Sequence, residues 1–188
     1  RFKNGGYFVD FGATIGVDLS NTFLLEREFG WNGILAEPSP AWHRDLEKNR
    51  RCIIDQRCVW RATGESIEFD IVAEGALSTI SLFSQSDLHA ATRACATKTI
   101  VEAITLLDLL STHNAPQVVD YLSVDTEGSE YEILSAFDFN RYKFNFISVE
   151  HNFTANREKI SDLLMKNGYR RVLEHLSQWD DWYVADAR

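Results

Sequence analysis

Residues that could do chemistry stand at the end of the first apolar run of the chain. This run, residues 7–11, carries Asp10 and continues into Gly12, Ala13, Thr14 and Gly16. Glycines let a ligand approach the backbone closely, and the free N–H groups that begin the following helix suit a carboxylate. The segment therefore predicts a ligand-binding loop, although an ordinary strand–loop–helix turn would look the same.

Glu37 ends the second apolar run, just before Pro38, and stands 37 − 16 = 21 residues after Gly16. An acid at about this spacing after a glycine loop is where nucleotide-binding folds hold a ribose. A carboxylate can accept charge-assisted hydrogen bonds from both ribose hydroxyls. Loop and spacing together favour ribose binding at Glu37 and Pro38 over the alternative, in which Glu37 only stabilises the next helix.

Two acidic clusters follow later runs: Asp125-Thr126-Glu127-Gly128-Ser129-Glu130 after residues 118–124, and Glu150-His151-Asn152 after residues 144–149. Neighbouring parallel strands end at one edge of a sheet, so we expect both clusters on the rim of the binding loop. An ordinary pKa of about 6.5 makes His151 the first candidate for a general base. Glu150 or Asp125 could orient it or act in its place, and Glu127 is a further catalytic candidate. Alternatively, Glu127 and Glu130 are helix N-terminal acids and His151 is structural.

A divalent metal is a second possibility at this rim. Asp125, Glu150 and Asn152 would offer the oxygen ligands that hard cations prefer. We favour the version without a metal and assign no metal ligand. The cysteines, Cys52, Cys58 and Cys95, match no metal spacing and indicate free thiols in a reducing compartment.

Short strand-like and helix-like segments alternate along the chain, which predicts one α/β domain over residues 1–188. We expect a mainly parallel, doubly wound sheet with helices on both faces and an antiparallel strand pair at the end. The predicted strands cover residues 7–11, 33–37, 58–60, 66–72, 118–124, 144–149, 169–174 and 182–186. The predicted helices cover residues 18–29, 40–50, 128–137 and 155–167. Residues 74–98, with Ser78, Thr79, Ser81 and Arg93, are expected to be irregular apart from a short helix and to cover the site as a lid.

The composition of the chain limits the kinds of partner that it is expected to bind. Among 188 residues, 19 are Lys or Arg and 28 are Asp or Glu, a net charge of −9, which repels nucleic acid and anionic membranes. No apolar run approaches the roughly 18 residues of a transmembrane helix, and no signal peptide is recognised. We therefore expect a cytoplasmic protein that acts on a small molecule; the sequence does not indicate its oligomeric state.

The absence of several phosphate-binding and catalytic motifs helps to choose between the ligands that contain a ribose. The loop reads Gly-x-x-x-Gly, not the Gly-x-Gly-x-x-Gly that wraps a pyrophosphate, and no Tyr-x-x-x-Lys pair or Walker A loop is present. S-Adenosylmethionine carries a ribose and a carboxylate but no phosphate, and it fits best. Trp60 could stack on its adenine or could belong to the core.

The chain resembles the FkbM-type methyltransferases. The matching pieces include Gly5 to Ala13, Gly30-Trp31-Asn32-Gly33, Glu37-Pro38, Asp125 to Glu130 and Val149 to Asn152, in the order of that family. The resemblance implies a Rossmann-like class I methyltransferase fold, S-adenosylmethionine as cofactor, and O-methylation of a sugar or natural-product hydroxyl. It implies Asp10, Gly12 and Ala13 at the cofactor loop, Glu37 on the ribose, and Asp125 and Glu127 at the active-site rim.

The chain departs from the family at Thr14, where many relatives carry Asn, and at Trp60-Arg61, where an acidic or small polar residue often meets the adenine. Two other functions stay open. One is a non-catalytic cofactor-binding or scaffold domain with the same fold. The other, in third place, is an NAD(P)-dependent oxidoreductase.

Overall fold

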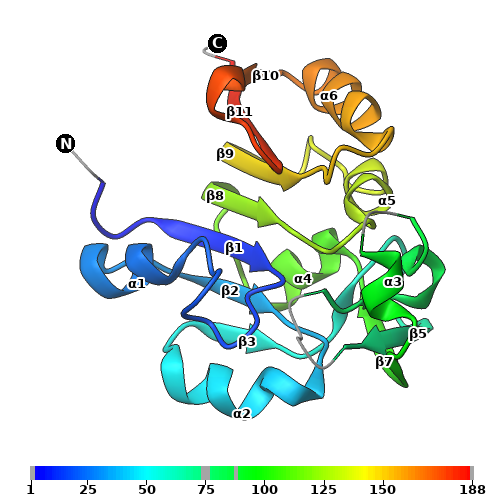
Figure 1. The fold of residues 1–188 in the computed structure, drawn as a ribbon. Coiled ribbons are helices and arrows are strands. Elements are labelled where there is room, and N and C mark those ends of the chain that lie inside the picture. The colour runs from blue at the N-terminus through cyan, green and yellow to red at the C-terminus, as the bar shows by residue number, and fades with distance from the viewer. Residues whose placement is uncertain (1–2, 73–76, 87–88, 187–188) are drawn as a thin grey trace.

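The central sheet carries most of the fold. A computed structural model describes residues 3–72, 77–86 and 89–186. Within them, a seven-stranded sheet has the order β10-β11-β9-β8-β1-β2-β3 (Figure 1). Pairing is parallel from β9 to β3, and β11 is antiparallel to both β9 and β10. This confirms the predicted fold class. The strands are β1 (Tyr7–Phe11), β2 (Asn32–Ala36), β3 (Ile53–Asp55), β8 (Val118–Val124), β9 (Lys143–Glu150), β10 (Tyr169–Val172) and β11 (Asp180–Ala185).

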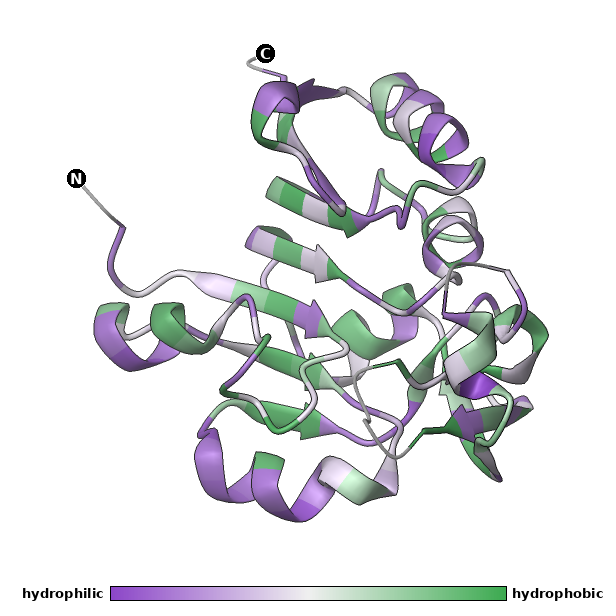
Figure 2. Cartoon of the chain, viewed as in Figure 1, coloured by the Kyte–Doolittle hydropathy of each residue, from purple (hydrophilic) through white to green (hydrophobic). Residues whose placement is uncertain are grey.

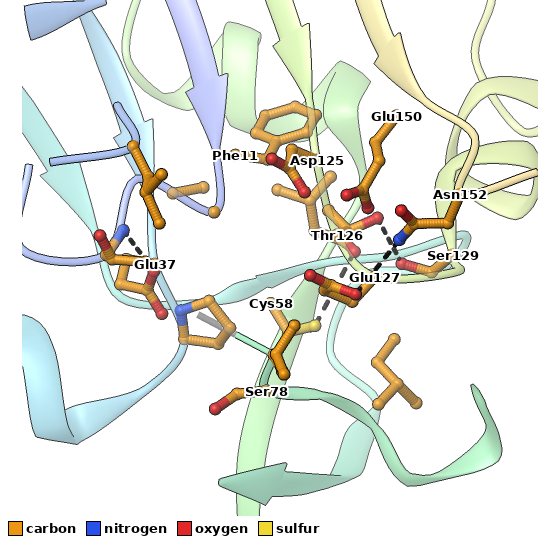
Figure 3. A pocket seen from close by; sticks show the side chains of 18 of the residues that line it. Phe11, Glu37, Cys58, Ser78, Asp125, Thr126, Glu127, Ser129, Glu150 and Asn152 are labelled. Atoms are coloured by element: carbon orange, nitrogen blue, oxygen red, sulfur yellow. Dashed lines mark hydrogen bonds between the residues drawn. The ribbon is translucent and has the colours of Figure 1, made fainter. Parts of the chain in front are cut away.

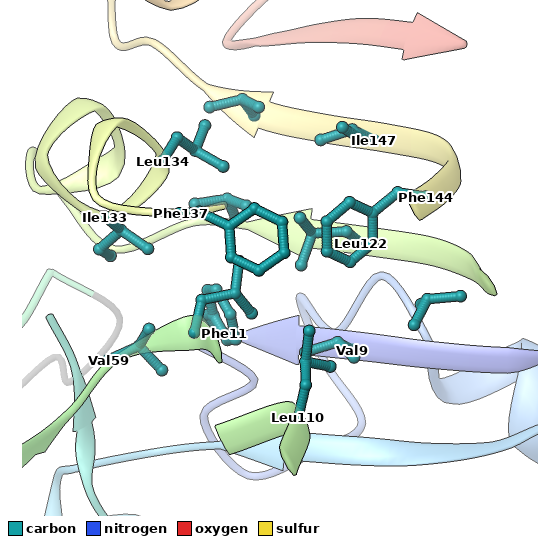
Figure 4. Close-up of a cluster of buried hydrophobic side chains, with 14 of the residues drawn as sticks. Val9, Phe11, Val59, Leu110, Leu122, Ile133, Leu134, Phe137, Phe144 and Ile147 are labelled. Carbon is teal, nitrogen blue, oxygen red and sulfur yellow. The ribbon is translucent and has the colours of Figure 1, made fainter. Parts of the chain in front are cut away.

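Alternation along the strands gives the sheet two different faces. Val9 and Phe11 of β1 join the large core with apolar residues of α4, α5 and α6 (Figure 4). Phe8, one position away, belongs to a smaller cluster on the opposite face with Leu46 of α2. Full burial of each such side chain contributes roughly 1.5–3 kcal/mol. The helices are α1 (Phe23–Phe29), α2 (Pro40–Asn49), α4 (Leu106–Thr112), α5 (Glu130–Ser135) and α6 (Asn156–Lys166), and the 3-10 turn η2 covers Glu174–Leu176.

Hydropathy follows this layering. Figure 2 shows hydrophobic residues along the central strands and hydrophilic residues on the outer surfaces of α2 and α6. Among the described residues, no helix combines the length and apolar character that crossing a membrane requires.

A second, smaller sheet lies beyond the carboxyl ends of the central strands (Figure 1). Its order is β4-β7-β5-β6, and Trp60, Phe69, Ile80 and Val101 are buried in a core of their own there. The elements are β4 (Cys58–Val59), β5 (Ser66–Ile71), β6 (Thr79–Ile80), β7 (Thr97–Ile104), the turn η1 (Ser81–Phe83) and the short helix α3 (Ala90–Arg93). We call this unit, residues 58–104, the cap.

The cap corrects two expectations. Residues 58–60 are not the third strand of the central sheet: β3 fills that place, and β4 pairs with β7 instead. Asp55, at the end of β3, accepts hydrogen bonds from Arg57 and contacts His113. These contacts hold the turn between two short strands that resemble each other in sequence, β3 and β4. In the segment 74–98, the short helix α3 agrees with the prediction, whereas β6, η1 and the start of β7 are regular elements that the sequence did not indicate. Residues 74–76 and 87–88 of this segment lie outside the described residues.

Gly12 joins the ends of β1 and β8. Its φ is +82°, and a Cβ at this position would lie 2.1 Å from the Asp125 carbonyl oxygen. Gly64 has the same φ of +82° but nothing within 4 Å of a Cβ, so it is a matched control. An alanine at Gly64 meets only the cost of a left-handed backbone, about 1–2 kcal/mol.

We predict that Gly12→Ala lowers the free energy of unfolding by about 1–3 kcal/mol more than Gly64→Ala does, the range for overpacking. Urea denaturation of both variants measures this difference. Equal losses of unfolding free energy in the two variants would show that the Asp125 carbonyl after β8 does not restrict the side chain at position 12.

Candidate functional site

A cavity of about 490 Å³ opens where the carboxyl ends of β1, β2, β8 and β9 meet the cap (Figure 3). Residues from all four strand ends line it, as do Phe69, Leu77, Ser78 and Ile80 of the cap. No Lys or Arg occurs among the described residues that line this cavity. Its wall is therefore acidic, with the side chains of Glu37, Asp125, Glu127, Glu150 and Asp180.

Glu37 is a buried carboxylate on the β2 side of the cavity. It is 4% exposed, and it accepts hydrogen bonds from the backbone N–H of Ser39 (2.9 Å) and of Thr14 (3.1 Å). Burial nevertheless raises the pKa of Glu37 to about 7. Each carboxylate oxygen can accept more than one hydrogen bond, so Glu37 fixes the loop after β1 and keeps acceptor capacity for a ligand.

Some residues at the end of β1 and in the loop after it line the cavity, and others do not reach it. Gly12 and Thr14 line the cavity, whereas Asp10, Ala13 and Gly16 do not. Asp10 lies buried beneath the loop and accepts hydrogen bonds from the hydroxyls of Thr22 (2.7 Å) and Ser20 (3.2 Å). The buried guanidinium of Arg50 donates to the same two hydroxyls and to the Gly16 carbonyl. Asp10 therefore shapes the loop from below, without reaching the cavity.

The motif after β8 also has two parts. Asp125, Thr126, Glu127 and Ser129 line the cavity. Glu130, the first residue of α5, turns back and accepts hydrogen bonds from the backbone N–H groups of Thr126 and Gly128, both at 3.0 Å. Its role is that of a helix N-terminal acid, which was one of the two alternatives for this residue.

Glu127 connects the cap to this motif. Its backbone is left-handed, with φ of 58°, and its carboxylate accepts a hydrogen bond from Arg93 Nη2 at 2.8 Å. Arg93 is fully buried and also donates to the Leu77 carbonyl, while Thr79 Oγ1 donates to the Glu127 carbonyl at 2.9 Å. Of the expected lid residues, Ser78 lines the cavity and Ser81 instead bonds Asp70.

Three carboxyl groups from two neighbouring strand ends gather at one side of the cavity. Asp125, Glu127 and Glu150 bring carboxyl oxygens within 4.8 Å of one another. Burial, and then the neighbouring negative charges, raise the pKa of Asp125 and of Glu150. Such an oxygen-only group suits a hard cation or a positively charged part of a ligand. Asn152 lies beside it, but its amide donates to Glu127 at 3.4 Å.

His151 is absent from this cavity. Its ring lies with Val149, Arg157 and Asp181 around a separate, small hollow. Nδ1 accepts a hydrogen bond from the backbone N–H of Phe153 (3.1 Å), and Nε2 lies 3.3 Å from the Ser177 hydroxyl. Burial and then Arg157 lower the pKa of His151, so a neutral ring joins the loop after β9 to the loop before β11.

Trp60 lies outside the cavity, and two residues that the sequence did not indicate lie at it. Trp60 is 3% exposed, packs on Phe83 in the core of the cap, and does not line the cavity. Trp179 and Asp180 do line it, although their sequence gave no such indication. The antiparallel register of β11 and β9 places Asp180 opposite Glu150, and only this pairing would have indicated them. Other lining residues that the sequence did not indicate include Leu19, Asn21, Cys58 and Phe69, whereas Leu77 and His89 belong to the segment 74–98 that was expected to cover the site.

We predict that Arg93→Leu lowers the free energy of unfolding by about 3–5 kcal/mol, because it leaves the buried Glu127 carboxylate without its cation. Denaturant titration measures this. Lys98→Ala removes an exposed ion pair with Glu68 on the same cap, and this control should leave the midpoint unchanged. A similar small effect in both variants would mean that the cap does not depend on Arg93.

Comparisons with known proteins identify the family of the chain and proteins of similar fold. The family model of the methyltransferase FkbM domain matches residues 10–182. A search of curated proteins gives no match. Among solved structures, the chain is similar to methyltransferase FkbM from Methylobacillus flagellatus KT, with a TM-score of 0.60 and 12% identity over 98% of this chain. It covers 44% of that protein, which is less than half of its length.

A second similar structure is precorrin-6y C5,15-methyltransferase from Geobacter metallireducens GS-15, with a TM-score of 0.48 and 11% identity, covering 100% of this chain and 83% of that one. At these identities the structural likeness concerns the fold, whereas the family model spans nearly the whole sequence. The chain belongs to the FkbM methyltransferase family.

Proposed function

We propose that this chain binds S-adenosylmethionine in the 490 Å³ cavity and transfers a methyl group to a hydroxyl of a small molecule, such as a sugar or natural product. One observation carries most of the proposal. The cavity offers a buried carboxylate, Glu37, at the position expected for a ribose, in a wall without Lys or Arg among its described residues. Membership of the FkbM methyltransferase family supports the reaction class.

The lining suits the parts of this cofactor. Glu37 keeps acceptor capacity for ribose hydroxyls, and the apolar side chains of Pro38, Val59 and Phe69 offer a surface for an adenine. The backbone of Gly12 and Thr14 borders the same space. A dinucleotide would in addition need partners for its pyrophosphate, usually N–H groups of a glycine loop or cations, and the acidic wall repels it. We therefore rank NAD(P)-dependent oxidation below methyl transfer.

Bound S-adenosylmethionine would supply an electrophilic methyl group on a positively charged sulfur. The main task of the protein is then alignment of the acceptor oxygen, which can lower the barrier by roughly 7–11 kcal/mol. The C–O bond forms while the C–S bond breaks, and the hydroxyl proton leaves to a base.

A general base must come within hydrogen-bond reach of that proton. Asp125 and Glu150 line the cavity and His151 does not, so we assign the base to one of these two carboxylates. His151, the first candidate from the sequence, takes the role of holding the neighbouring loops.

We predict micromolar binding of S-adenosylhomocysteine and none of NADH when the purified chain is titrated by calorimetry. Glu37→Ala should weaken S-adenosylhomocysteine binding by about 1–3 kcal/mol, the range for loss of a charged hydrogen-bond partner. Glu47→Ala, on the exposed side of α2, is the control and should not change it. Binding of NADH alone would revive the oxidoreductase. If S-adenosylhomocysteine binds but a panel of hydroxyl acceptors gives no turnover, the scaffold function gains support.

The raised pKa of Glu37 gives this binding a pH dependence. Ribose hydroxyls donate to the ionised carboxylate, and ionisation of Glu37 occurs at a pH of about 7 in the free protein. The affinity for S-adenosylhomocysteine should therefore rise between about pH 6 and pH 8 and level off above. Calorimetry across this range should show the slope in the wild-type chain and a flatter profile in Glu37→Gln. The same slope in Glu37→Gln would assign the titration to another group.

A further inference from the structure

Asp125 and Glu150 lie together at one side of the cavity, and neither forms an ion pair with a described Lys or Arg. In contrast, Glu127 is paired with the buried Arg93. The Oε2 atom of Glu150 is buried and has no hydrogen-bond partner. Figure 3 shows Glu150 and Asp125 directed toward each other at one side of the cavity, while Glu37 lies at the other side.

Two partly buried carboxyl groups side by side are costly when both are ionised, because each loses contact with water and the two charges repel each other. Burial, and then the neighbouring negative charges, raise the pKa of both groups, and a hydrogen bond joins the Asp125 side chain to that of Glu150. A positive charge between the two carboxyl groups would offset their repulsion and lower both pKa values. The structure therefore favours a ligand that brings such a charge to this side of the cavity.

We propose that Asp125 and Glu150 recognise the positive sulfur of S-adenosylmethionine, and so distinguish this substrate from the neutral product S-adenosylhomocysteine. The inference rests on the proposed function. The sulfur is bonded to the 5′ carbon of the ribose, so a ribose held at Glu37 keeps it inside the same cavity. The ends of β2 and β8 are separated by β1 alone, about 10 Å across two strand spacings.

The ammonium and carboxylate groups of the methionine part are the same in substrate and product. A difference between their affinities therefore reports the methyl group and the positive charge that it places on the sulfur, and a charged ligand without this methyl group separates the two contributions. Loss of that charge on methyl transfer would weaken the hold on the product and favour its release.

The test is calorimetry of the purified chain with S-adenosylmethionine, S-adenosylhomocysteine and sinefungin, in which a charged amine replaces the methylated sulfur. We expect the two charged ligands to bind about 10- to 100-fold more tightly than S-adenosylhomocysteine, the range for one charge-assisted contact. In Asp125→Asn and in Glu150→Gln, this ratio should fall toward 1, with the affinity for S-adenosylhomocysteine retained.

Glu68→Gln is the matched control, because it removes one negative charge from an exposed position of the cap; its ratio should equal that of the wild-type chain. Equal affinities of the wild-type chain for all three ligands would overturn the inference and leave the proposed function standing. A ratio unchanged in both folded variants would remove Asp125 and Glu150 from this role. If none of the three ligands binds, the proposed function fails and the inference fails with it.

Discussion

The contact between Gly12 and the carbonyl of Asp125 is the constraint on which the site depends. It lets β1 and β8 end side by side, because no side chain stands between Gly12 and the backbone of the next strand. The loop after β1 can then bond Glu37 on one side, while the motif after β8 turns toward β9 on the other. A ligand that spans these strand ends meets the groups of β2, β8 and β9 in one cavity.

Charge is distributed unevenly around that cavity. The cations near it are used inside the protein: Arg50 holds the loop from below, and Arg93 ties the cap to Glu127. The carboxylates of Asp125 and Glu150 are left facing the cavity. In the proposed reaction a proton from the acceptor would reach one of these carboxylates as the positive sulfur becomes neutral. The net charge inside the cavity would then stay constant, which limits the cost of the reaction in a buried place.

The sequence predicted the central sheet apart from β3, because the other strands are apolar, end at glycine or acidic residues and alternate with helices, whereas β3 has only three residues. At the cap it predicted β4 and β5 as strands, but it assigned β4 to the central sheet, because the partner of β4 lies far along the chain in β7, and it missed β6 and β7. Glu37, Asp125 and Glu150 could be placed on one rim because parallel strands end together. The prediction that the His151 side chain faces the site was wrong. Side chains along β9 alternate between the two faces of the sheet, so His151 lies on the face of Val149 and away from that of Glu150. Trp179 and Asp180 could not be found without the register of β11.

The backbone around the cavity has a cost of its own. Five non-glycine residues with φ between 41° and 63° lie in the segments that follow β1, β8 and β9: Thr14, Leu19, Glu127, Asn152 and Phe153. Residues in this left-handed region typically cost about 1–3 kcal/mol each, so part of the folding energy of the sheet is used to hold these loops in place. An engineer who seeks a more thermostable chain would find gains with Gly or Asn at Leu19 and Phe153, whose side chains are exposed. Those gains would loosen the segments that shape the cavity, so selection for stability alone would erode ligand binding first.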